Sequence, residues 1–95
     1  KYADELLANP NLSETEEEKL FVEELQALIN HTVEQMSPQR KLVYRMSREE
    51  GLTNDQIALK LGVSKRTVEN HLTAALAILR KVIYAFLLAH ISGGI

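Results

Sequence analysis

Between residues 66 and 73 the chain carries polar side chains whose types and spacing suit contact with nucleic acid. At helical spacing they fall on one side, with Lys65 at its edge: Arg66, Glu69, Asn70 and Thr73. Val68 and Leu72 fall on the opposite side. Such polar groups can hydrogen-bond to base edges or phosphates, and an α-helix fits the DNA major groove. The segment therefore predicts a DNA-contacting helix whose other face is held by a core.

Catalysis is not predicted for this chain. Its histidines, His31, His71 and His90, lie on separate segments without metal-ligand spacing, and His71 is expected to pack on the apolar flank of its helix. There is no cysteine, and hence no thiol nucleophile or thiolate metal site. We expect no enzyme activity, no cofactor, no metal and no small-molecule substrate.

The charge of the chain is divided between two segments. Residues 1–36 carry nine acids and two bases, a net charge of −7, whereas residues 37–81 carry nine bases and four acids, a net charge of +5. A basic block beside an acidic one is typical of a domain that meets a polyanion while its neighbouring segment does not. The polar face lies in the basic block.

The first element that could support this face is a helix predicted over 14–36. Ser13 and Glu16 have the spacing of a capping box, which starts the helix near Glu14. Apolar residues then recur at three- and four-residue steps from Phe21 to Met36. This apolar stripe needs a partner.

A second helix is predicted over 38–50. Serine followed by proline, Ser37-Pro38, is a helix start, because proline at the first helical position loses no hydrogen bond. Gly51 is expected to end the helix in the left-handed conformation. The positions expected to be buried are Leu42, Val43 and Met46.

A third and a fourth helix are predicted to form a helix-turn-helix over residues 53–73. Thr53 and Gln56 make a second capping box, and Ser64 is the expected cap of the fourth helix. Between them, Gly62 is expected to turn the chain where a side chain would clash. The apolar positions of this unit are Ile57, Ala58, Leu61 and Val63.

The apolar stripe of the fourth helix continues beyond this unit to Phe86, and the segment Val82 to Ile91 is apolar around most of its circumference. A helix that is apolar all round is usually buried. We expect the Phe86 side to pack on the first helix. The side that carries Tyr84 and Leu88 is expected to meet a partner, and self-association of the chain through this segment is one interpretation.

The predicted fold is all-α, a small domain of about four helices without strands. Residues 1–13 are expected to be a linker or lead-in, 14–91 the helical domain and 92–95 a loose C-terminus. No run reaches the roughly 18 consecutive apolar residues that span a bilayer, and the N-terminus has no signal pattern. We therefore expect a soluble, cytoplasmic protein.

The segment Leu42 to Lys81, "LVYRMSREEGLTNDQIALKLGVSKRTVENHLTAALAILRK", resembles region 4 of extracytoplasmic-function sigma factors, the promoter-reading subunits of bacterial RNA polymerase. It is especially similar to the group of these factors found in Bacteroidetes. The resemblance covers about 45 residues from Met36. It implies a helix-turn-helix of the winged-helix-like superfamily that binds the minus-35 promoter element. A separate region 2 would bind and melt the minus-10 element.

The resemblance also implies roles for individual residues. Ser64, Lys65, Arg66 and Thr67 would hold the DNA backbone, and Thr53 and Asn54 would contact phosphates of the second strand. Glu69, Asn70 and Thr73 would face the groove, where Glu69 can accept from cytosine N4 and Asn70 can pair with adenine. The expected partners are promoter DNA, the flap element of core RNA polymerase and an anti-sigma factor.

A competing interpretation applies to Leu52 to Leu72 alone. The effector domain of two-component and quorum-sensing activators also has a "GL.N.QIA..L..S..TV.NHL" pattern. The lead-in "SPQRKLVYRMSREEG" and the ending "AALAILRK" are more similar to sigma factors, which makes the sigma interpretation the preferred one.

Overall fold

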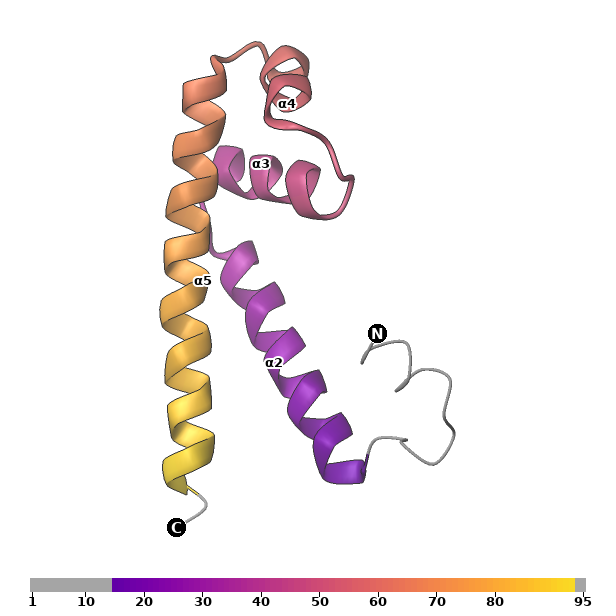
Figure 1. The fold of residues 1–95 in the computed structure, drawn as a ribbon, viewed down its shortest axis with the longest axis vertical. Coiled ribbons are helices and arrows are strands. Elements are labelled where there is room, and N and C mark those ends of the chain that lie inside the picture. Colours follow the sequence, from indigo (N-terminus) through magenta and orange to yellow (C-terminus); the bar gives the residue numbers. More distant parts are fainter. Residues whose placement is uncertain (1–14, 94–95) are drawn as a thin grey trace, which may run out of the picture.

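The computed structural model describes residues 15–93, which form four helices and no strand (Figure 1). The helices are α2 (Glu16–Glu34), α3 (Pro38–Arg48), α4 (Asn54–Leu61) and α5 (Lys65–Gly93). The predicted all-α fold is thus confirmed. Figure 1 shows α3 and α4 beside the N-terminal half of α5, and α2 inclined along its C-terminal half. The 29-residue α5 is the element to which every other described helix packs.

The start of α2 differs from the prediction. Ser13 lies outside the described residues, and the capping box of the structure is formed by Thr15 and Glu18. The Glu18 N–H donates to Thr15 Oγ1 at 3.1 Å, and the Thr15 N–H donates to Glu18 Oε1 at 2.9 Å. The helix therefore begins at Glu16, because the same pattern of hydroxyl and carboxylate recurs two residues further on.

The boundaries of α3 agree with the prediction to within two residues, but one buried position does not. Pro38 is its first residue, and Gly51, at φ 70°, follows its end. Ser37 is the N-cap without a side-chain hydrogen bond. Val43 and Met46 are buried, whereas the expectation that Leu42 is buried is wrong. Leu42 is 43% exposed.

The described residues form two separate apolar clusters along α5. The first joins α3, α4 and the start of α5 and contains Val43, Met46, Ile57, Ala58 and Val68. The second joins the end of α2 to the middle of α5 and contains Val33, Met36, Ala75 and Leu79. One cluster therefore supports the helix-turn-helix, and the other attaches α2.

Aromatic contacts extend the packing of α2 on α5. The rings of Phe21 and Phe86 lie 5.2 Å apart, and the His90 ring meets Phe21 edge-on at 5.1 Å. His90 Nε2 also lies 3.8 Å from Glu24 Oε1. The predicted contact of the Phe86 side of the last helix with the first helix is confirmed. The helix itself continues to Gly93, through part of the segment that the sequence suggested to be loose.

The stretch Lys65–Ser92 of α5 is long and apolar enough to cross a membrane, judged by length and composition alone. Core helices of soluble proteins meet the same criterion, yet only 11% of its most apolar window is buried in the chain. Much of the apolar surface of α5 is therefore left uncovered.

Candidate nucleic-acid interface

The turn between α4 and α5 is fixed by Gly62 and Val63. Gly62 has φ 68° and ψ 35°, the left-handed conformation that glycine adopts at little cost. The Val63 N–H donates to the Ala58 carbonyl at 3.0 Å, and its side chain packs against the first cluster. A Cβ at Gly62 would meet nothing within 4 Å, so the expected clash is wrong. Backbone conformation, not lack of space, favours glycine here.

Ser64 caps α5 as predicted. The Thr67 N–H donates to Ser64 Oγ at 3.1 Å, and the two side-chain hydroxyls lie 2.9 Å apart. The first amides of a helix have no partner within the helix, and they favour an anion. Lys65 and Arg66 are exposed beside them. This end of α5 can thus receive a phosphate, although the hydroxyl of Thr67 is already engaged with Ser64.

The polar face that the sequence indicates is exposed in the structure. Its members are Arg66, Glu69, Asn70 and Thr73. None of these side chains hydrogen-bonds or ion-pairs with another residue among 15–93. On the other side of the helix, Val68 is fully buried and Leu72 packs against the same cluster. The face is therefore held rigidly by the core while its hydrogen-bonding groups stay available.

The start of α4 lies next to this end of α5. The Gln56 N–H donates to Thr53 Oγ1 at 3.1 Å, and the Thr53 N–H donates to Gln56 Oε1 at 2.8 Å, as the capping box predicts. Lys65 Nζ lies 3.6 Å from Asp55 Oδ1, with both side chains more than half exposed. Asn54 is half-buried. An exposed pair of this kind is weak, so a phosphate can compete for Lys65.

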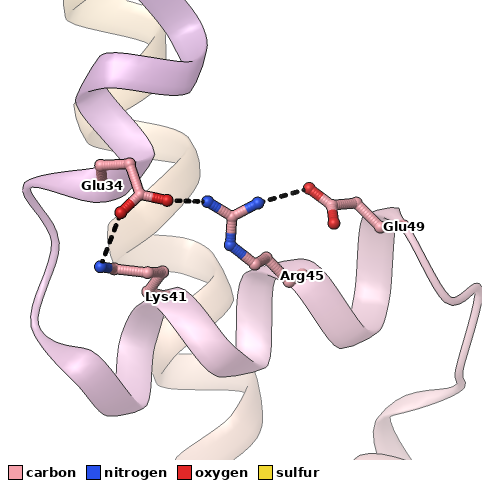
Figure 2. Close-up of polar contacts among 4 residues, drawn as sticks. All are labelled: Glu34, Lys41, Arg45 and Glu49. Atoms are coloured by element: carbon pink, nitrogen blue, oxygen red, sulfur yellow. Dashed lines mark hydrogen bonds and ion pairs between the residues drawn. The ribbon is translucent and has the colours of Figure 1, made fainter.

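Two of the bases counted toward the +5 segment pair with Glu34 across the turn between α2 and α3. Figure 2 shows Glu34, at the end of α2, between Lys41 and Arg45 of α3. Lys41 Nζ donates to Glu34 Oε1 at 3.1 Å, and Arg45 donates to the other Glu34 oxygen. Arg45 also donates to Glu49 Oε2 at 2.8 Å. The basic surface free for DNA is thus smaller than the sequence suggested.

The same contacts change the acidity of Glu34. The hydrogen bond and the charge of Lys41, helped by Arg45, lower the pKa of the Glu34 carboxyl below its ordinary value. The spacing of Arg45 and Glu49 indicates an i,i+4 pair from the sequence. The ion pairs of Glu34 with Lys41 and Arg45 have no comparable spacing signal in the sequence, because they depend on the angle between α2 and α3.

A groove of about 370 Å³ lies where α2, α3 and α5 meet. Ile29, Leu79 and Ile83 belong to its apolar lining, which Arg48 and Arg80 complete with charge. This groove has no signal in the sequence, since its walls come from three helices. Among its lining residues, only the exposed Tyr84 is predicted from the sequence to meet a partner.

Residues 26–79 match the family model described as "Sigma-70, region 4". The matched range runs from the middle of α2 through the helix-turn-helix to the centre of α5. No curated protein and no solved structure matches the chain.

Proposed function

The chain belongs to the sigma-70 region 4 family, and on this premise we propose that its helix-turn-helix reads the minus-35 promoter element for an extracytoplasmic-function sigma factor. Region 4 of sigma-70 factors binds promoter DNA and RNA polymerase, so the general function follows from the family. The observation that carries the finer proposal is the face of α5 with four exposed polar side chains, opposite the buried Val68. A helix so held can enter the major groove.

In the proposed complex, the N-terminal turn of α5 lies against one phosphate backbone. Lys65, Arg66 and the capped end at Ser64 position the helix, as phosphate contacts do. Glu69, Asn70 and Thr73 face the base edges. Thr53 and Asn54 reach a phosphate of the other strand. Thr67 contributes through its cap contact with Ser64, which fixes the first turn.

The groove between α2, α3 and α5 is the proposed contact with polymerase. Its apolar lining suits an apolar segment of a partner protein, and its two arginines suit acidic groups beside such a segment. Its α5 residues, from Leu76 to Tyr84, lie further along the helix than the polar face, which ends at Thr73. An anti-sigma factor and a second copy of the chain remain predicted partners. We propose a binding rather than a catalytic function.

A promoter footprint tests this proposal directly. Holoenzyme assembled from core polymerase and the full-length factor is expected to protect DNA around the minus-35 element. Removal of residues 15–93 should abolish this protection and leave protection around the minus-10 element in place. If protection near minus 35 survives the removal, the assignment is wrong.

A further inference from the structure

We propose that the outer stripe of α5, formed by Tyr84, Leu88 and Ile91, pairs two copies of this chain through antiparallel α5 helices. These residues recur at four- and three-residue steps, so they line one side of the helix. They are exposed by 59%, 62% and 71% in the single chain. The opposite side of the same turns is occupied by the contact of Phe86 and His90 with Phe21.

The charges on α5 select a second copy and its direction. Beyond Glu69 the helix has no acid, and its charged residues before His90 are Arg80 and Lys81. A parallel pair would place these two bases beside their own copies, which costs free energy. An antiparallel pair with Tyr84 against Leu88 of the second copy places Lys81 opposite Ile91 and Arg80 opposite Ser92 of that copy.

This register brings Arg80 and Lys81 of each copy to the C-terminal end of α5 in the other copy. The last carbonyl groups of a helix carry partial negative charge and favour nearby bases. The two bases of each copy thus lie beside the C-terminal carbonyls of the other copy. The same surface of both copies forms the interface, as two-fold symmetry requires. An anionic membrane surface is a poorer occupant, because the neighbouring α2 carries Glu16, Glu17, Glu18, Glu23 and Glu24.

Pairing of this kind would also regulate the chain. Tyr84 is part of the stripe and also lines the groove, and Arg80 lines the groove beside the stripe. A second copy and the polymerase segment would therefore compete. This consequence rests on the proposed function, whereas the pairing itself does not.

Sedimentation equilibrium of the 95-residue chain, without DNA or polymerase, tests the pairing. The chain is expected to shift from monomer to dimer as its concentration rises through the micromolar range. Leu88→Glu should raise the dimer dissociation constant at least about tenfold, because it acts twice at the centre of a two-fold interface. Leu59→Glu is the matched control, since Leu59 is 86% exposed on α4, away from the stripe. Circular dichroism of both variants verifies that they fold.

Disulfide trapping tests the direction of the pair in a chain that has no cysteine. When the Tyr84→Cys and Leu88→Cys variants are mixed under oxidation, the mixed disulfide should form in excess over either like disulfide. A chain that stays monomeric, or a dimer that Leu88→Glu leaves intact, would overturn the proposal. Dominant pairing of Tyr84→Cys with itself would overturn the antiparallel arrangement. Since no DNA or polymerase is present, each result is independent of the footprint.

Discussion

Arg66 and Asn70 lie one helical turn apart on the exposed face of α5, yet they are expected to act differently. Arg66 is in the first turn of the helix, beside the capped N-terminus where a phosphate is favoured. Asn70 is further along the same face, where its amide can reach a base edge. One residue should therefore contribute to affinity and the other to sequence preference.

Substitution of each residue by alanine separates these roles. Arg66→Ala should weaken binding to all duplexes alike and flatten its salt dependence, because a phosphate contact releases counterions. Asn70→Ala should instead change the preferred bases, at a cost of about 1–3 kcal/mol for a lost bidentate pair. Titrations over salt and over single-base variants of the site measure both effects. Asn30→Ala, at an exposed asparagine of α2, is the control. Identical profiles for Arg66→Ala and Asn70→Ala would contradict the assignment.

The carboxylate of Glu34 makes stability depend on pH. Lys41 and Arg45 lower its pKa in the folded chain from an ordinary value of 4.5. Its contribution to the free energy of unfolding is therefore present above pH 4.5 and is lost as the pH falls through the lowered pKa. Glu34→Gln should lower the melting temperature at neutral pH, and this difference from wild type should vanish in acid.

Thermal melts over a pH series check the effect of Glu34→Gln. Glu23→Gln is the matched control, because Glu23 is an exposed glutamate on the same helix that makes no ion pair with another residue in the described range. A difference between Glu34→Gln and wild type that stays constant down to acid pH would show that the ion pairs across the turn contribute nothing.

At the scale of elements, the turn between α4 and α5 depends on the left-handed conformation of Gly62. An L-residue with a side chain pays about 1–2 kcal/mol in this region, and asparagine tolerates it better than alanine does. Since a Cβ at this position meets no atom within 4 Å, the cost of Gly62→Ala should be conformational only. Gly62→Ala should thus lower the free energy of unfolding by about 1–2 kcal/mol, and Gly62→Asn by less. Denaturant titrations that rank asparagine below alanine would refute this account.

The attachment of α2 to α5 should be separable from the helix-turn-helix. Phe86→Ala removes the ring that packs on Phe21 and leaves the cluster around Val43, Ile57 and Val68 unchanged. Because Phe86 is only half-buried, the loss should be about 2 kcal/mol, below the 3–5 kcal/mol of a fully buried phenylalanine.

Hydrogen exchange locates the effect of Phe86→Ala along the chain. Amides of α2 should exchange faster, whereas those of α4 should keep their protection, since the two clusters share no buried residue. Leu88→Ala, on the exposed side of α5, is the control, measured at a concentration at which the chain is monomeric. Equal loss of protection in α2 and α4 would show one cooperative unit instead of two.

For the molecule as a whole, the isolated chain is expected to bind minus-35 DNA weakly. Affinity for DNA comes largely from phosphate neutralisation, and the +5 of residues 37–81 is reduced where Glu34 engages Lys41 and Arg45. Tethering through polymerase to a second promoter contact would raise the effective concentration and compensate. Titration of the duplex at physiological salt, with and without core polymerase and region 2, measures this gain. Tight, sequence-specific binding by the isolated chain would contradict it.

Features of this protein that depend on residues close together in the chain can be read from the amino-acid sequence. The limits of the helix-turn-helix are set by the capping box of Thr53 and Gln56, the left-handed Gly62 and the cap at Ser64. Each of these features involves residues no more than three positions apart. Spacing likewise predicted which side of α5 would be polar, because a helix repeats every 3.6 residues. The family follows from residues 26–79, which include the helix-turn-helix.

Features that depend on how the helices cross are set by the packing of the whole chain. The position of Glu34 against Lys41 and Arg45 is set by the angle between α2 and α3, which no local pattern fixes. The exposure of Leu42, and the groove that includes Ile29, Tyr44 and Tyr84, depend equally on which helix covers which flank. Spacing shows that a face is apolar, whereas the packing of the whole chain determines whether that face is covered.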